Sequence, residues 1–146
     1  MYFVDRGKIE STLSYMEKMD SLFKQHDSWE SSMDKLALER IVHMMIEAVI
    51  DVGNAMIDGF IMRDPGSYED IISIMLDEKV VTEADAKSLT GLIRYRKGLV
   101  QEYTSLDHAE LVSVLNENAA AIERFPASIR RYLDEELGPV SAFSPH

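Results

Sequence analysis

The spacing of apolar residues along the chain predicts helices. The first periodic segment follows Asp5, a residue type that caps helix N-termini. Its apolar positions recur every three or four residues, at Ile9, Leu13, Met16, Met19 and Phe23. This pattern ends near the polar segment 25–28, and no part of the chain shows the sustained alternation of a half-buried strand. We therefore expect an all-α protein.

Four further helix starts are marked by a capping residue followed three positions later by an acidic residue, the spacing of a capping box. The pairs are Ser31/Asp34, Ser67/Asp70, Thr82/Asp85 and Asp107/Glu110. They predict a long helix over about 33–62, which Pro65-Gly66 closes, and a short helix through 71–76. They also predict a medium helix that carries Leu89 to Val100 and a last helix that is kinked or broken at Pro126 and stopped by Gly138-Pro139. The short connections favour an antiparallel bundle of four to five helices.

The length of 146 residues fits one domain, which we place at residues 1–138. Residues 139–146 lack periodicity, and we expect them to form a disordered tail. The start of the chain has no long apolar run, and acidic residues interrupt the most apolar window, 44–62. These features favour a soluble cytoplasmic protein without a membrane segment.

The long helix over 33–62 is apolar over a wide arc of its surface. One stripe holds Ile41, Met45, Ala48, Val52 and Met56, and further apolar residues lie elsewhere at Met44, Ile50, Ile57 and Ile61. A helix of this kind is buried on more than one side. Burial within the bundle and a homodimer face are both open interpretations.

The same helix carries a polar stripe, made of Glu39, His43, Glu47, Asp51, Asn54 and Asp58. Glu39, His43 and Glu47 lie on successive turns and could bridge a metal ion. A di-iron bundle, however, uses a Glu-x-x-His motif on each of two helices, and the chain has no such pair. A solvated or cleft-lining face is the preferred interpretation, with no metal and no cofactor.

Composition excludes several classes of site. The chain has no cysteine, which excludes disulfides, thiolate metal sites and a cysteine nucleophile. It also lacks the glycine-rich phosphate loops and the G-x-S-x-G motif. The net charge of −11 opposes nucleic-acid binding unless basic residues gather locally.

Basic residues do gather between Ala86 and Leu99. Lys87, Arg94, Arg96 and Lys97 are the charged residues of that segment, and all are positive. The segment could bind phosphate, or it could only balance acidic neighbours and a helix dipole.

The chain resembles the HepT-like toxin branch of the HEPN superfamily over roughly residues 5–115. The resemblance rests on DVGNAMIDGF at 51–60, PGSYEDIISIML at 65–76 and LTGLIRYRKGLVQEYTSLD at 89–107. That branch is characterised by an R-x4-H-x-Y motif. Arg96 matches its arginine, Leu99-Val100 its apolar pair and Tyr103 its tyrosine.

The resemblance implies a helical homodimer whose motif helices line one cleft, and a metal-independent ribonuclease activity. The arginine would hold the scissile phosphate, here Arg96 with Arg94 and Lys97 beside it, while the motif histidine would move protons. Relatives are often paired with a nucleotidyltransferase antitoxin, which in some attaches AMP to the motif tyrosine. The counterpart here is Tyr103. We expect its phenol to share a cleft with Arg96 or with that residue of the dimer mate, against the alternative of a core tyrosine with only its hydroxyl exposed.

Two residues depart from the motif. Gln101 stands at the histidine position, and glutamine cannot act as a general acid or base because it does not titrate. Lys97 stands where the family has a compact polar residue. His108 lies twelve positions after Arg96, so the loop after Tyr103 would have to fold back for it to replace the missing histidine.

Three functions therefore remain open. The first is a HepT-like ribonuclease-type toxin with a degenerate motif. The second is a catalytically silent dimer that binds a nucleotide, RNA or a nucleotidyltransferase partner. The third is a helical module whose basic segment only balances charge.

Overall fold

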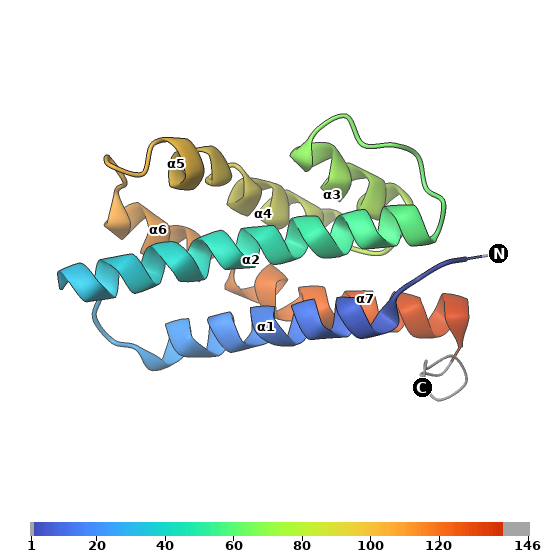
Figure 1. The fold of residues 1–146 in the computed structure, drawn as a ribbon, viewed down its shortest axis with the longest axis horizontal. Coiled ribbons are helices and arrows are strands. Elements are labelled where there is room, and N and C mark those ends of the chain that lie inside the picture. Colours follow the sequence, from blue (N-terminus) through green and yellow to red (C-terminus); the bar gives the residue numbers. More distant parts are fainter. Residues whose placement is uncertain (1, 139–146) are drawn as a thin grey trace.

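A computed structural model describes residues 2–138, and all regular secondary structure in that part of the chain is helical (Figure 1). The helices are α1 (Arg6–Gln25), α2 (Ser32–Gly59), α3 (Tyr68–Asp77), α4 (Glu83–Ile93), α5 (Arg96–Gln101), α6 (His108–Glu117) and α7 (Ala119–Leu137). The all-α prediction is confirmed. The predicted disordered tail, 139–146, lies outside the described residues.

The capping residues expected from the sequence hold the starts of five helices. Asp5 accepts a hydrogen bond from the Lys8 amide, and Ser67, Thr82 and Asp107 each accept one from the amide three positions on. Ser31 forms the full reciprocal box with Asp34. Each cap satisfies an amide that the helix leaves unbonded at its first turn.

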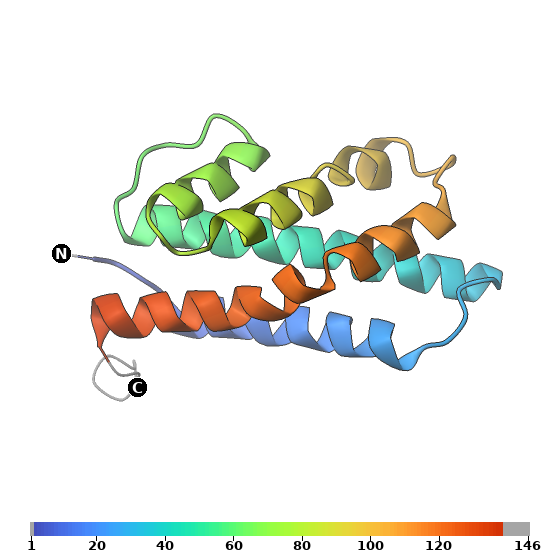
Figure 2. The ribbon, with the colours of Figure 1, turned by 180° about the vertical axis from the view of Figure 1, so that it is seen from behind.

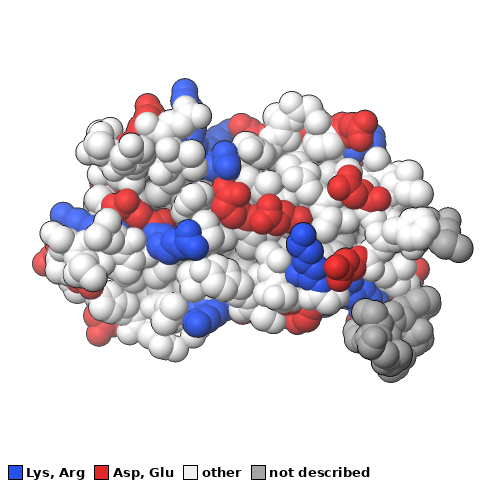
Figure 3. All heavy atoms as spheres, in the orientation of Figure 1, with Lys and Arg blue, Asp and Glu red and all other residues white. Residues whose placement is uncertain are grey.

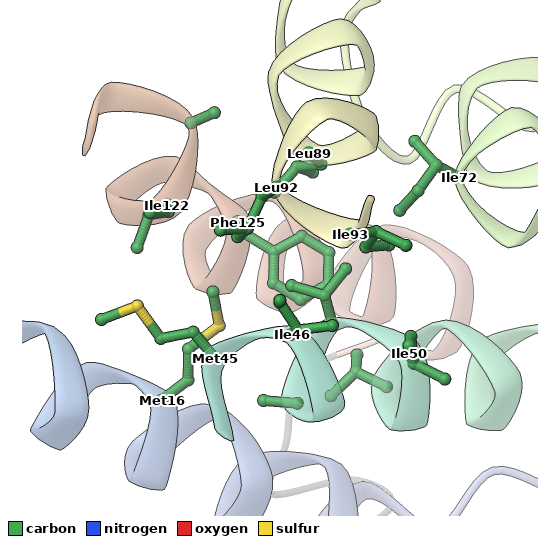
Figure 4. Close-up of a cluster of buried hydrophobic side chains, with 14 of the residues drawn as sticks. Met16, Met45, Ile46, Ile50, Ile72, Leu89, Leu92, Ile93, Ile122 and Phe125 are labelled. Carbon is green, nitrogen blue, oxygen red and sulfur yellow. The ribbon is translucent and has the colours of Figure 1, made fainter. Parts of the chain in front are cut away.

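α2 is the central element of the bundle. It packs against α1, α3, α5 and α6, while α7 lies against α1 and α4 (Figures 1 and 2). The side chains of α2 meet those of the other helices in the core drawn in Figure 4, where Met45, Ile46 and Ile50 belong to the same buried cluster as Phe125 of α7. Both apolar stripes of α2 are largely buried in this way, so the bundle itself accounts for most of the wide apolar arc. The arc therefore gives little support of its own to a dimer face.

α2 ends at Gly59, three residues before the predicted end at Met62. Phe60 forms the cap and Ile61 adopts a left-handed φ of 55°. This turn places the ring of Phe60 in the core, edge-on to the ring of Tyr132 with centroids 5.1 Å apart, and leaves Ile61 exposed. Burial of the aromatic ring is the physical reason for the early stop.

The predicted medium helix is divided at Arg94-Tyr95 into α4 and α5. The Tyr95 amide bonds to the Leu92 carbonyl oxygen at 3.1 Å, which tightens the last turn of α4. The Tyr95 hydroxyl donates to Glu110 of α6 at 2.8 Å. This hydrogen bond joins residues fifteen positions apart, so the local sequence pattern does not predict it. It holds the turn between α4 and α5, and α5 packs against α2.

Of the kink or break predicted at Pro126, the break does not occur. α7 runs through Pro126 without interruption, and the break lies at Asn118, between α6 and α7. The Asn118 side-chain amide donates to the Val114 carbonyl oxygen at 2.8 Å and so satisfies an end group of α6. Gly138 ends α7 as predicted, with a φ of 85°.

The two ends of the described chain are tied together by Arg6. Its buried guanidinium donates to Asp134 at 2.7 Å and to the carbonyl oxygens of Leu133 and Gly138. No helix among the described residues is both long enough and apolar enough to cross a membrane.

Candidate functional site

Arg96, the arginine of the motif, is the first residue of α5 and contacts two other helices. Its Nε atom donates to Oε1 of Glu47, on α2, at 2.6 Å. The guanidinium carbon lies 4.6 Å from the centroid of the Tyr68 ring, at the start of α3. This distance is that of a cation–π contact. Arg96 is therefore held in one orientation while about a quarter of its side chain remains exposed.

The contact with Glu47 uses only the Nε edge of the guanidinium. Within residues 2–138, neither terminal nitrogen of Arg96 takes part in a hydrogen bond or ion pair with another side chain. Those two nitrogens form the fork that binds phosphate oxygens in a bidentate manner. The contact with Glu47 thus leaves both terminal nitrogens available for hydrogen bonds to a phosphate.

A histidine lies next to this arginine, although the motif histidine is missing. Nε2 of His43, one turn before Glu47 on α2, lies 3.2 Å from the same Oε1 atom that accepts from Arg96. The two nitrogens are therefore no farther apart than the sum of those two bond lengths. We call Arg96, Glu47, His43 and Tyr68 the Arg96 cluster.

The residues of this cluster stand in segments that the sequence singled out, but the sequence did not predict that they lie in contact. Glu47 and His43 lie on the predicted polar stripe of the long helix, and Tyr68 lies in the block at 65–76. The stripe defined one face of one helix, whereas the structure shows that α5 lies across this face.

The other predicted phosphate-binding residues lie at the surface near Arg96. Arg94 is exposed, and its Nη2 atom lies 3.1 Å from Glu69. Lys97 and Gln101 are exposed on α5, where Gln101 is the last residue. The face in Figure 3 shows acidic side chains in a row over α2 with basic ones scattered beside them, so the cluster is a local site within a mixed surface.

Tyr103 is 65% exposed, so the alternative of a core tyrosine is wrong. It lies in the turn after α5, which ends at Gln101. Helical spacing therefore does not extend from Arg96 to Tyr103, and the aromatic ring in contact with the guanidinium is that of Tyr68. The cleft shared with Arg96 or with the mate's Arg96 stays a prediction.

His108 begins α6 and does fold back to α2. Its Nε2 atom lies 2.7 Å from Oε2 of Glu39, one turn before His43. Two glutamates of the polar stripe therefore contact different histidines: Glu39 contacts His108, and Glu47 contacts His43. Within the described part of the chain, no group of three or more histidine and acidic side chains is arranged to hold a metal ion.

The remainder of the stripe lines a groove between α1 and α2 with a volume of about 350 Å³, together with Lys8 and Thr12. Burial raises the pKa of the Asp51 carboxyl above its usual range, and the charge of Glu47 raises it further against opposing effects of Lys8 and Arg96. The cleft-lining interpretation of the stripe therefore agrees with the structure.

Comparison with known proteins gives one family. The family model described as "Ribonuclease HepT-like" matches residues 12–129. The Bacillus subtilis (strain 168) protein named "Putative RNase YutE" is 54% identical over 143 residues, which cover 98% of this chain and 99% of that protein.

Solved structures agree with the fold. The structure of YutE, described as a cytosolic protein of unknown function from Bacillus subtilis, matches with a TM-score of 0.95 and 55% identity, and covers 98% of this chain and 100% of that one. A tri-AMPylated Shewanella oneidensis HEPN toxin in complex with its MNT antitoxin matches with a TM-score of 0.75 at 17% identity, over 84% of this chain and 96% of the toxin. The second likeness shows a shared fold. The chain belongs to the HepT-like ribonuclease family.

Proposed function

We propose that this protein is a HepT-like toxin-type RNA endonuclease that acts without a metal ion and has a degenerate catalytic motif. The observation that carries the proposal is the state of Arg96. Glu47 and Tyr68 fix its guanidinium, and the terminal nitrogens have no partner among residues 2–138. A preoriented arginine of this kind can bind the scissile phosphate and stabilise the charge that develops on it.

The chemistry needs no cofactor. The 2′-hydroxyl of one ribose attacks the adjacent phosphorus, the bond to the 5′-oxygen breaks, and a 2′,3′-cyclic phosphate and a 5′-hydroxyl form. Gln101 can donate or accept a hydrogen bond in this step but cannot carry the proton. We therefore expect an enzyme that is slow for this class unless another residue moves the proton.

The second candidate is a catalytically silent dimer that binds RNA or a nucleotide. It is favoured by Gln101 at the histidine position and by the carboxylate of Glu47 beside Arg96. That carboxylate reduces the net positive charge offered to a phosphate.

The proposal includes a homodimer in which two Arg96 clusters line one cleft, and control by a nucleotidyltransferase antitoxin. Leu36 of α2 and Val100 of α5 are exposed apolar side chains, which supports a surface that a second copy could cover. Tyr103 is accessible to a modifying enzyme, and the fold relative from Shewanella oneidensis is a tri-AMPylated toxin bound to its antitoxin. Sedimentation should report a mass near twice 16.6 kDa, and a monomer at micromolar concentration would contradict the shared cleft.

The test of the function is an RNA cleavage and binding assay in the presence of EDTA. The wild type is compared with Arg96→Ala and with Lys18→Ala, which removes one positive charge from the exposed face of α1. The endonuclease proposal predicts cleavage by the wild type and Lys18→Ala, and a loss of about 100-fold or more in Arg96→Ala. Binding without cleavage would favour the silent dimer, and absence of both would overturn the two candidates together.

A further inference from the structure

We infer that His43 is the proton-transfer residue of the Arg96 cluster and takes the part for which Gln101 is chemically unsuited. The inference rests on the proposed function and adds a residue to it from a different helix. Its basis is the single carboxylate oxygen, Oε1 of Glu47, that contacts both the Arg96 and His43 side chains.

The geometry of His43 is that of an oriented base. One ring nitrogen, Nε2, faces the Glu47 carboxylate at 3.2 Å, and within residues 2–138 no hydrogen bond involves the other, Nδ1. A carboxylate that holds one nitrogen of an imidazole fixes the orientation of the ring, as in catalytic triads. The side chains of His43 and Arg96, which contact the same oxygen atom, are both partly exposed, at 29% and 26%, so both are accessible to a ligand.

The surroundings of His43 place both signs of charge near it. Glu39 and Glu47 lie one turn away on either side along α2, and Arg96 approaches from α5. His108 of α6 lies on the Glu39 side, and Tyr68 of α3 lies over Arg96. An imidazole can accept and release a proton during a reaction, which the amide of glutamine cannot.

The two alternative proton carriers fit less well. Gln101 lies at the exposed end of α5 and does not titrate. His108 contacts Glu39, and within residues 2–138 no hydrogen bond or ion pair joins it to Glu47 or Arg96. His43, by contrast, contacts the same oxygen atom of Glu47 that accepts the hydrogen bond from Arg96.

In the proposed step, neutral His43 accepts the proton of the 2′-hydroxyl as that oxygen bonds to phosphorus. Arg96 binds the phosphate oxygens while the bond from phosphorus to the 5′-oxygen breaks. The imidazolium of His43, or a water molecule that takes its proton, then protonates the leaving 5′-oxygen. The proton lost by one oxygen is gained by the other, so the step needs no further reactant.

The test compares rates of RNA cleavage from pH 5 to pH 9 for the wild type, His43→Asn and His108→Asn. Asparagine cannot accept and release the proton and is too short to replace the Nε2 contact, and the two variants are matched because each histidine contacts one glutamate of α2 through Nε2. We expect His43→Asn to lose about 100- to 10,000-fold in rate, together with the limb of the pH profile that a histidine gives. His108→Asn should keep both the rate and the profile. A wild-type rate and profile in His43→Asn would overturn the inference.

A second measurement does not depend on turnover. RNA with 2′-O-methyl groups has no attacking hydroxyl and should bind without being cleaved. We expect its addition to shift the His43 ring resonances in the NMR spectrum of the wild type, and to leave them unshifted in Arg96→Ala. Saturating binding that leaves the His43 resonances unmoved would overturn the role of His43 even if RNA is cleaved. A shifted resonance in a protein that cleaves no RNA would instead support the position of His43 and contradict the endonuclease function.

Discussion

Glu47 and Arg96 are 49 residues apart in the sequence and are joined by a hydrogen bond of 2.6 Å between Oε1 and Nε. This bond gives Glu47 two opposing effects on phosphate binding. It orients the guanidinium so that the terminal nitrogens are available, and it places a negative charge near the phosphate that would bind there.

Replacement of Glu47 by glutamine should separate these two effects. The amide oxygen can still accept from Nε, whereas the negative charge is lost. We expect Glu47→Gln to bind 2′-O-methyl RNA a few-fold more tightly, on the scale of about 1 kcal/mol for a partly exposed charge. Fluorescence anisotropy at fixed salt measures this change, and weaker binding than in the wild type would contradict it.

Packing between α2 and α3 depends on a glycine. A Cβ atom added at Gly53 would overlap Ile71 Cγ2 and lie 3.2 Å from Met75 Cε. We expect Gly53→Ala to lower the free energy of unfolding by about 1–3 kcal/mol because the core there has no room. Gly91→Ala is the matched control, since nothing lies within 4 Å of its added Cβ and α4 should gain about 0.5–1 kcal/mol from alanine. Urea denaturation of both variants tests the pair, and equal effects of the same sign would refute this account of the packing.

Acid stability should depend on Asp70, which anchors the connection between α2 and α3. Arg63 donates to its two oxygens at 2.8 and 2.9 Å, and the Gly66 amide also donates to it. The Arg63 contact, with help from Gly66, lowers the pKa of Asp70 from its ordinary value of 3.8 to about 2. Because the folded-state pKa is the lower one, the stabilisation is complete above about pH 4 and is lost as the pH falls toward 2.

The measurement is the free energy of unfolding of wild type and Asp70→Asn between pH 2 and pH 6. The wild type should be more stable at pH 6, and the difference should shrink on acidification. A difference that stays constant across this range would show that the carboxylate charge of Asp70 is not the cause.

The local part of the fold could be predicted from the sequence. Residues such as Asp5 and Ser31 mark helix starts because a cap acts on an amide only a few positions away. The break at Tyr95 could not be predicted, since it depends on a bond to Glu110 fifteen residues on. The early end of α2 likewise depends on the burial of Phe60 against Tyr132.

The sequence identified candidate residues of the site but could not predict the contacts between them. The motif identified Arg96, Gln101 and Tyr103, and the spacing of four residues placed His43 and Glu47 on one face of one helix. Neither signal states which helix lies across that face. The contact between Arg96 and Glu47 is a tertiary one, and only the packing of α5 on α2 reveals it.

Modification of Tyr103 offers a test of the proposed antitoxin partnership. Because Tyr103 is exposed, its phenol oxygen can attack the α-phosphate of ATP in the active site of a nucleotidyltransferase, which releases pyrophosphate. We expect incubation with such a partner and ATP to add the mass of AMP to the wild type but not to Tyr103→Phe. Equal modification of both proteins, seen by mass spectrometry, would exclude Tyr103 as the acceptor.

The central claim is that Arg96 binds the phosphate of RNA, and the affinity for 2′-O-methyl RNA tests it most directly because no cleavage is required. Wild type, Arg96→Ala and Lys18→Ala are compared at one salt concentration. The account predicts that Arg96→Ala binds about 10- to 100-fold more weakly, the scale of a lost hydrogen bond to a charged group, while Lys18→Ala binds as the wild type does. Equal affinities for all three proteins, or equal losses in the two variants, would contradict a phosphate site at Arg96.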